Sequence, residues 1–382
     1  MPEGSFGWAK AEDTYTKEES GLVNTIHCYE FLNNASELAN FLKEPGDATF
    51  YDTFYKSVID GEDIIPNWFR SYESRYPEGE EDDGSDVDIE SFYRLASWVN
   101  SCDTNSATGE DLEEEYEFTK NKETIVYTKD TKEYRLAKFE KEFEDYFNLT
   151  FTAVYYVLTD TLLMIDSRAK NMMLATWDNT HWYPIFYDMD TMLGLNNYGY
   201  NKFGYDVEDT DANIYNGQNS VLWNNFRACF QPTINAIYNQ LRKTGLNYNN
   251  LLKIYNEGQA DALNEISSNA DARYKYVRPF TEGYINSVTG DKVWVEPGSV
   301  DYLYAAQGRR SMHREWWIDN RLNYQDGMRL SEAYQNDRFI MRLYTPEAGT
   351  ITYVPVDLDE NSYVVGKYYI QLVDEVTGDT SY

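Results

Sequence analysis

Residues 149–171 read LTFTAVYYVLTDTLLMIDSRAKN, and residues 177–194 read WDNTHWYPIFYDMDTMLG. The first stretch is almost wholly apolar up to Ile165, which predicts a helix that is buried on all sides. The second stretch carries aromatic and apolar residues around a turn at Asp178 and Asn179, and this pattern predicts a β-hairpin. Together the two stretches predict a buried helix, a polar loop and a hairpin, in that order.

Polar residues follow both predicted elements at a spacing that has a chemical use. Asp166 and Asn171 lie just after the apolar stretch, and Asp188 and Asp190 end the hairpin. In phosphoryl transfer by kinase-like folds, an Asp orients or deprotonates the acceptor, an Asn binds magnesium, and a later Asp binds the metal ions. The alternative is structural, because Asp-x-Asp sequences also close turns by hydrogen bonding to backbone amides.

The order of these residues resembles that of the CotH-type (spore-coat) protein-kinase-like family, which has an Asp, an Asn and then an aromatic-Asp-x-Asp element before a glycine turn. The resemblance covers residues 140–195. It implies an atypical protein-kinase-like fold in which Asp166 is the catalytic residue. Asn171, Asp188 and Asp190 would bind magnesium, and ATP would be the second cofactor of an active enzyme.

Two parts of the kinase pattern are missing from the sequence. No glycine-rich phosphate loop precedes the site, and Met164 and Ile165 stand where a basic residue would precede the catalytic Asp. The residues that would bind the nucleotide are therefore not identified. Lys120, Lys129 and Lys138 are candidates only by their position in the chain.

Segments on both sides of this site resemble large structural and tail proteins of bacteriophages that contain a CotH-like domain. The segments are WFRSYESRYP (68–77), LASWVNSCDT (95–104) and QGRRSMHREWWIDNRLNYQDG (307–327). The resemblance implies a virion structural protein of the tail, assembled in the host cytoplasm, whose partners are other virion proteins or copies of itself. An active Mg/ATP-dependent protein kinase is the alternative function, and a carbohydrate-binding adhesin is the third.

Composition limits the kinds of partner. The 382 residues include 65 acidic and 33 basic residues, and the net charge of −32 repels nucleic acid and anionic membrane surfaces. No stretch of about 18 apolar residues is present, so no membrane span is predicted. Cys28, Cys102 and Cys229 lie far apart, which argues against both a disulfide scaffold and a zinc ribbon.

Tyrosine is unusually frequent, with 35 residues in a chain that is 16% aromatic. A tyrosine side chain offers a large contact area and a polar tip, and it suits surfaces that become buried against a partner. The composition therefore favours assembly contacts. A tyrosine-rich core and a carbohydrate-facing groove are the alternatives.

Three charged segments each have two interpretations. The basic residues of the run 307–327 either contact phosphate or an acidic neighbour, or pair with carboxylates of this chain; they are Arg309, Arg310, His313, Arg314 and Arg321. The acidic segment 110–115 either collects cations or is solvated surface, and the acidic segment 206–217 either binds calcium through its oxygens or is solvated surface.

The predicted fold class is α+β, predominantly helical, with a β element at the carboxyl end. The predicted domains are an N-terminal segment at 1–88, a CotH-like kinase-fold core at 89–345 and the start of a β-rich element at 346–382. Helical spacing is expected at 36–42, 89–99, 133–147 and across 221–343, with a short strand pair around 287–295.

Overall fold

The structure of this chain is a computed structural model, and it divides into two compact units. It describes residues 26–32, 38, 49–79, 84, 86–106, 112–189, 191–194, 203–207, 220–255, 257–258 and 317–330, and the backbone of short strands between 284 and 381. Unit 1 comprises residues 1–35, 39–148 and 172–185, and unit 2 comprises 36–38, 149–171 and 186–382. Except for Leu38, the helix predicted at 36–42 lies outside the described residues.

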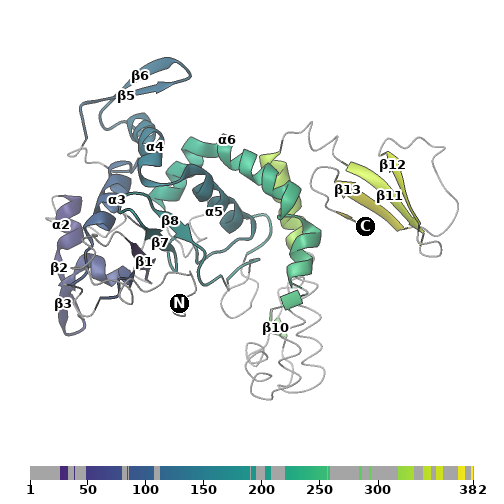
Figure 1. The fold of residues 1–382 in the computed structure, drawn as a ribbon, viewed down its shortest axis with the longest axis horizontal. Coiled ribbons are helices and arrows are strands. Elements are labelled where there is room, and N and C mark those ends of the chain that lie inside the picture. The colour runs from purple at the N-terminus through teal and green to yellow at the C-terminus, as the bar shows by residue number, and fades with distance from the viewer. Residues whose placement is uncertain are drawn as a thin grey trace, which may run out of the picture. The chain divides into compact units, whose positions relative to one another are not determined.

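The centre of unit 1 is a four-stranded antiparallel sheet with the strand order β4-β1-β7-β8 (Figure 1). Its strands are β1 (His27–Phe31), β4 (Tyr72–Tyr76), β7 (Met173–Thr176) and β8 (Tyr183–Ile185). The last two form the hairpin that the sequence predicts, and Asn179 takes a positive φ of 62° in its turn. The hairpin prediction is confirmed, but β8 ends at Ile185, so the prediction that Asp188 ends the hairpin is wrong.

Helix α3 (Glu90–Ser101) packs on this sheet through one aromatic side chain. The ring of Phe92 lies 4.7 Å from Tyr29, 4.8 Å from Tyr72 and 5.6 Å from Trp182, measured between ring centroids. The helix predicted at 89–99 is therefore confirmed, with a slightly later end.

Two hairpins and two further short elements complete the outer part of unit 1. They are α2 (Phe50–Tyr55), β2 (Ser57–Asp60), β3 (Asp63–Pro66), the 3-10 helix η2 (Asn67–Arg70), β5 (Glu115–Lys120) and β6 (Glu123–Thr128). In Figure 1 the strands β2 and β3 form one two-stranded ribbon, and β5 and β6 form another.

Helix α4 (Lys132–Tyr146) supports the β5–β6 hairpin. Tyr116 of β5 packs on Tyr134 of α4, with their ring centroids 5.2 Å apart. On the other side of α4, Phe139 and Phe143 are completely buried, as helical spacing predicts.

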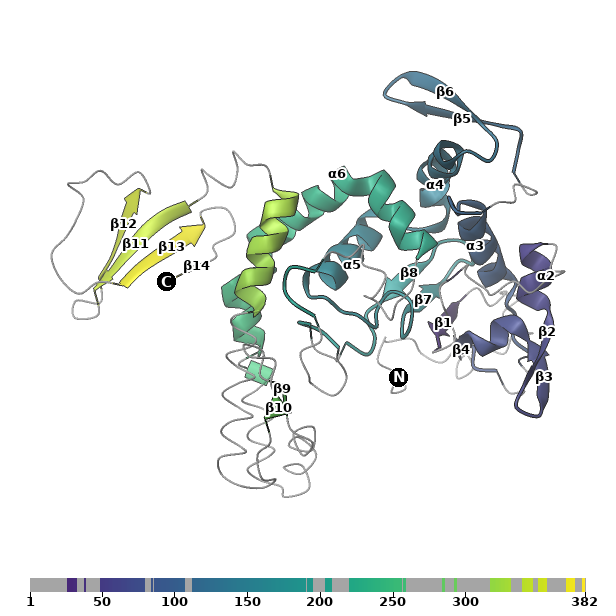
Figure 2. The ribbon, with the colours of Figure 1, turned by 180° about the vertical axis from the view of Figure 1, so that it is seen from behind.

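Unit 2 is built on the helices α5 (Leu149–Thr161) and α6 (Val221–Thr244), which pack against each other (Figure 2). The prediction that the first of these continues to Ile165 is wrong. It ends at Thr161, and Leu163 then takes a positive φ of 48°, a conformation that a helix cannot contain. Further helices lie at 248–255 and 317–329.

Strands follow toward the carboxyl end. The pair β9 (Tyr284–Ile285) and β10 (Lys292–Val293) agrees with the predicted strand pair. A four-stranded sheet has the order β12-β11-β13-β14. Its strands are β11 (Phe339–Thr345), β12 (Thr350–Pro355), β13 (Tyr369–Asp374) and β14 (Thr380–Ser381).

The sheet begins earlier than predicted. Helical spacing was expected as far as residue 343, and this is wrong from Phe339 onward, because the segment FIMRLYT is rich in the aromatic and β-branched residues that favour strands. The described residues form a mixed α+β fold, which confirms that part of the prediction. Within the described residues, no helix is long and apolar enough to cross a bilayer.

Candidate functional site

The candidate site lies in unit 2, where two loops are joined by their backbones. One loop follows α5 and covers residues 162–171; the other follows β8, and its described residues are 186–189 and 191–194. The amide of Leu193 donates to the carbonyl of Leu162 at 2.8 Å, and the amide of Ile165 donates to the carbonyl of Thr191 at 3.2 Å. These two hydrogen bonds hold the loop of Asp188 beside the loop of Asp166 and Asn171.

Asn171 and Asp188 are in direct contact across the two loops. The Asn171 side-chain nitrogen Nδ2 donates to Asp188 Oδ2 at 2.9 Å. Both residues take positive φ values, 54° and 47°, a region that non-glycine residues enter at a cost and that is often found at functional sites. Asp188 is exposed, so its carboxylate is open to a cation from solvent.

The two other predicted site residues are placed differently. Asp166 lies in the same loop as Asn171, but only 7% of its surface is exposed. Asp190 lies outside the described residues. Among the residues that the structure does describe, no three His, Cys, Asp or Glu side chains are grouped so that they could hold a metal ion. The described part of the site thus offers one exposed carboxylate and one amide to a cation.

Arg168 anchors the first loop, and the sequence reasoning missed it. Its Nε donates to Thr159 Oγ1 at 3.0 Å and its Nη2 donates to the carbonyl of Tyr156 at 2.9 Å. The guanidinium lies 4.1 Å from the centre of the Tyr156 ring, and Trp223 Nε1 donates to the Arg168 carbonyl at 3.0 Å. The only sign of this anchoring role in the sequence is the presence of an arginine between Asp166 and Asn171.

Tyr155 of α5 also holds this loop. Its hydroxyl donates to the Ser167 carbonyl at 2.5 Å, and complete burial raises the pKa of this tyrosine, so the hydroxyl keeps its proton. Arg168 and Tyr155 therefore both hold the segment between Asp166 and Asn171 against α5.

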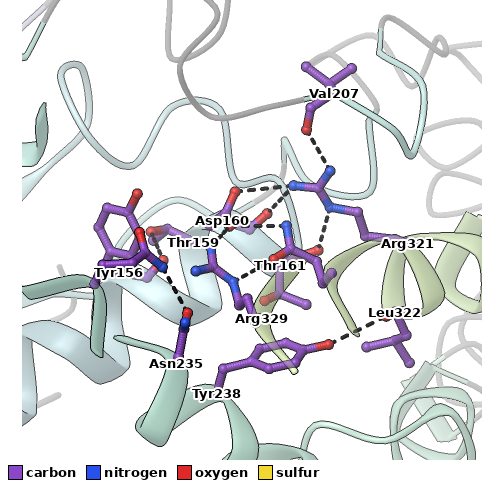
Figure 3. A network of polar contacts seen from close by, with 12 residues as sticks. Tyr156, Thr159, Asp160, Thr161, Val207, Asn235, Tyr238, Arg321, Leu322 and Arg329 are labelled. Carbon is purple, nitrogen blue, oxygen red and sulfur yellow. Dashed lines mark hydrogen bonds and ion pairs between the residues drawn. The ribbon is translucent and has the colours of Figure 1, made fainter. Parts of the chain in front are cut away.

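A buried polar network lies at the same, carboxyl-terminal end of α5 (Figure 3). Asp160, which is 1% exposed, accepts hydrogen bonds from Arg321 at 3.1 Å, from Gln325 at 3.0 Å and from Arg329. These three residues come from the helix at 317–329. The network fastens that helix to α5.

Arg321 belongs to the basic run for which two interpretations were open. It is 1% exposed and pairs with a carboxylate of its own chain, so internal pairing is confirmed for this residue. The other four basic residues of the run, Arg309, Arg310, His313 and Arg314, lie outside the described residues.

The second loop is connected to this network through Gly194. Its φ is +74°, and a Cβ added there would lie 2.3 Å from the Phe203 carbonyl oxygen and 2.8 Å from Trp317 Nε1. Only glycine fits this position. The segment 203–207 that it contacts is in turn held by Arg321, which donates to the carbonyls of Tyr205 and Val207 at 2.7 Å each.

No protein-family model, no curated protein and no solved structure matches the chain. The site is therefore interpreted from its own residues.

The lysines proposed for nucleotide binding have partners inside unit 1. Lys120 bonds to Glu140, Lys129 to Glu114 at 3.2 Å, and Lys138 to Glu142 at 2.6 Å. The carboxylate partners of Lys120 and Lys138 lie on α4, and Glu114, the partner of Lys129, directly precedes β5. These contacts give the three lysines a structural role.

Proposed function

We propose that this chain is a structural protein of a bacteriophage virion, part of the tail, and that it works mainly through assembly contacts. In this proposal an atypical kinase-like fold of the CotH type serves as an architectural module. The supporting observation is an exposed aliphatic pair on the β2–β3 hairpin. Ile59 and Ile64 are direct cross-strand partners, and 75% and 70% of their surfaces are exposed. Two adjacent isoleucines in water favour burial against another protein.

Acidic residues surround this pair and indicate the kind of partner. Asp60, Glu62 and Asp63 lie at the turn beside the isoleucines, and Arg70 is 3.5 Å from Asp60. A second copy would bring two such acidic turns together, which costs energy through like-charge repulsion. The end of the β2–β3 hairpin, called the β2–β3 tip below, is better matched by a different virion protein that offers an apolar pocket with a basic rim.

The test is incorporation into particles. The wild-type chain should be present in purified phage particles that are produced from the genome encoding it. The double variant Ile59→Ser with Ile64→Ser should be present in a lower amount. The matched control changes two exposed residues of the other hairpin, Ile125→Ser with Val126→Ser, and should leave the amount unchanged. Absence of the wild-type chain from purified particles would overturn the proposal.

The second candidate is an active Mg/ATP-dependent protein kinase, and the contact between Asn171 and Asp188 favours it. These two residues are 17 positions apart, yet the fold brings them to 2.9 Å. Magnesium prefers such oxygen ligands, and the Asn171 amide would present its oxygen after a half-turn of the amide group. Asp190 would complete the metal site, and Asp166 would be the catalytic residue.

Calorimetry with magnesium and ATP distinguishes this candidate from a purely structural site. Binding that Asp188→Ala abolishes, and that the exposed control Asp145→Ala preserves, would support a working nucleotide site. A folded wild-type chain that binds no ATP in the presence of magnesium would rule out the phosphotransferase.

A further inference from the structure

Two stacked aromatic rings lie at the turn of the β7–β8 hairpin: Trp177, which is exposed, and Tyr183, the half-buried first residue of β8. Trp177 and Tyr183 face each other with ring centroids 4.1 Å apart and planes inclined by 16°. At this distance and angle, each ring covers one face of the other. Trp177 nevertheless has 51% of its surface exposed. About half of the Trp177 surface is therefore open to solvent, with the Tyr183 ring against one face of the indole.

The turn between Trp177 and Tyr183 is ordered by the carboxylate of Asp178. Asp178 accepts hydrogen bonds from the amides of Thr180 at 2.9 Å and His181 at 2.7 Å. It also accepts one from Thr176 Oγ1 at 3.2 Å and contacts His181 Nδ1 at 2.7 Å. These contacts fix the turn before any ligand arrives, which reduces the conformational entropy that binding must overcome.

Polar groups lie next to the aromatic surface in the sequence and in the turn. The side chains of Asp178 and His181 are 40% and 42% exposed, and Thr180 is exposed as well. The loop thus combines one flat apolar plane with several hydrogen-bonding groups. Small-molecule sites commonly have this composition, with aromatic residues for contact area and a few polar groups for orientation.

We propose that the Trp177–Tyr183 platform binds a neutral saccharide. A pyranose ring has one face of C–H groups, which packs on the electron-rich face of an indole, and equatorial hydroxyls around its edge, which hydrogen-bond to carboxylate, imidazole and hydroxyl groups. The binding site lies on unit 1 and is independent of the assembly contacts proposed for the β2–β3 tip.

Charge decides between a saccharide and other flat ligands. Nucleobases also stack on exposed aromatic rings, but they come with phosphates, which a chain of net charge −32 repels. The same repulsion acts on uronic acids and on phosphorylated or sialylated sugars, and Asp178 places a negative charge directly at the platform. A neutral sugar avoids this cost.

The experiment is calorimetry of the whole chain with soluble neutral hexasaccharides, namely cellohexaose, maltohexaose, chitohexaose and mannohexaose. At least one of them should bind at concentrations up to about 5 mM, a range that detects even millimolar dissociation constants. Hexagalacturonate, which has the same length but carries carboxylates, should not bind.

Variants locate the binding at the platform. Trp177→Ala should weaken it about tenfold, in line with the loss of one aromatic stacking contact, whereas Trp177→Tyr should keep most of it. Tyr51→Ala is the matched control, because Tyr51 is an aromatic residue of the same unit and is 55% exposed. It should leave the affinity unchanged.

Three results would overturn the proposal. They are no binding of any neutral hexasaccharide by the folded wild type, an equal loss of affinity in Tyr51→Ala and Trp177→Ala, and self-association that Trp177→Ala abolishes. The last result would make the platform a contact between proteins. If Trp177→Ala does not fold, Trp177→Gln takes its place with the same expected loss, because it also removes the aromatic ring.

Discussion

Arg321 and Asp160 form an ion pair 161 positions apart in the chain, and their side chains are only 1% and 2% exposed. Both groups leave water when the helix at 317–329 docks on α5. A charge buried in this way is tolerated because each partner has further hydrogen bonds: Asp160 accepts from Gln325, and Arg321 donates to backbone carbonyls. Removal of one member is therefore expected to destabilise the fold, because the other charge stays buried without its partner.

The first prediction concerns that pair. Asp160→Ala leaves Arg321 and Arg329 buried without their carboxylate, and we expect a loss of about 3–5 kcal/mol in the free energy of unfolding. Urea denaturation followed by circular dichroism measures it. The control is Lys253→Ala, which removes an exposed pair with Glu257 and should cost less than about 0.5 kcal/mol. Similar losses in the two variants would contradict the prediction.

A second prediction concerns Arg168, which holds the loop of Asp166 and Asn171. Arg168→Leu removes two buried charge-assisted hydrogen bonds to α5, each worth roughly 1.5–3 kcal/mol in proteins, and leaves the Tyr156 carbonyl without this donor. Amide hydrogen exchange should accelerate in residues 162–171 more than in α3. Lys170→Leu, in the same loop but half-buried, is the control. An unchanged exchange pattern in Arg168→Leu would show that the loop is held by other contacts.

Glycine at position 194 gives a third prediction. Gly194→Ala introduces a Cβ 2.3 Å from the Phe203 carbonyl oxygen at a residue with a φ of +74°. The left-handed conformation alone costs about 1–2 kcal/mol for an L-residue, and the clash adds to it. Thermal unfolding of Gly245→Ala is the comparison, because no atom lies within 4 Å of a Cβ built there and its φ is −106°. That variant should be close to the wild type in stability.

The fourth prediction is a pH dependence at Asp178. Partial burial tends to raise the pKa of this carboxyl, but hydrogen bonds from the His181 side chain and from the amides of His181 and Thr180 outweigh it and lower the pKa to about 2. Since the folded pKa is below the ordinary value of 3.8, the carboxylate stabilises the fold above about pH 3.8, and this contribution is lost as the pH falls toward 2.

Carboxyl-carbon NMR titration measures the Asp178 pKa directly. His181→Ala should raise it toward the ordinary value, because the side-chain hydrogen bond is removed. Thr180→Ala keeps the backbone amides in place and should leave it near 2. A wild-type titration midpoint near 4 would contradict the structure of this turn.

Local patterns in the sequence predicted the elements near the site. The apolar run of α5 and the aromatic residues around Asp178 each lie within one helix or one hairpin, so the periodicity in a short window is enough. Even there, the end of α5 was misplaced by four residues. Leu163 is as apolar as its neighbours, and its left-handed backbone has no signal in the composition.

Long-range contacts were not predictable in the same way. Asp160 is a polar residue within a largely apolar helix, and its partners Gln325 and Arg329 come from a segment more than 160 positions later. Similarly, nothing local distinguishes Arg168, which binds α5, from Lys170 two positions on. The contact of Asn171 with Asp188 was suggested by the family resemblance and not by spacing alone.

The interleaving of the two units has a consequence for synthesis on the ribosome. Unit 1 needs β7, which pairs with β1, but residues 149–171 of unit 2 come between α4 and that strand. A nascent chain that has emerged only as far as Asn148 has β1 beside β4 and lacks the other two strands of its central sheet. The nascent amino-terminal unit therefore cannot complete its core until residue 185 has left the exit tunnel, and a fragment cut at residue 148 is expected to expose Tyr29 and Phe92 and to aggregate.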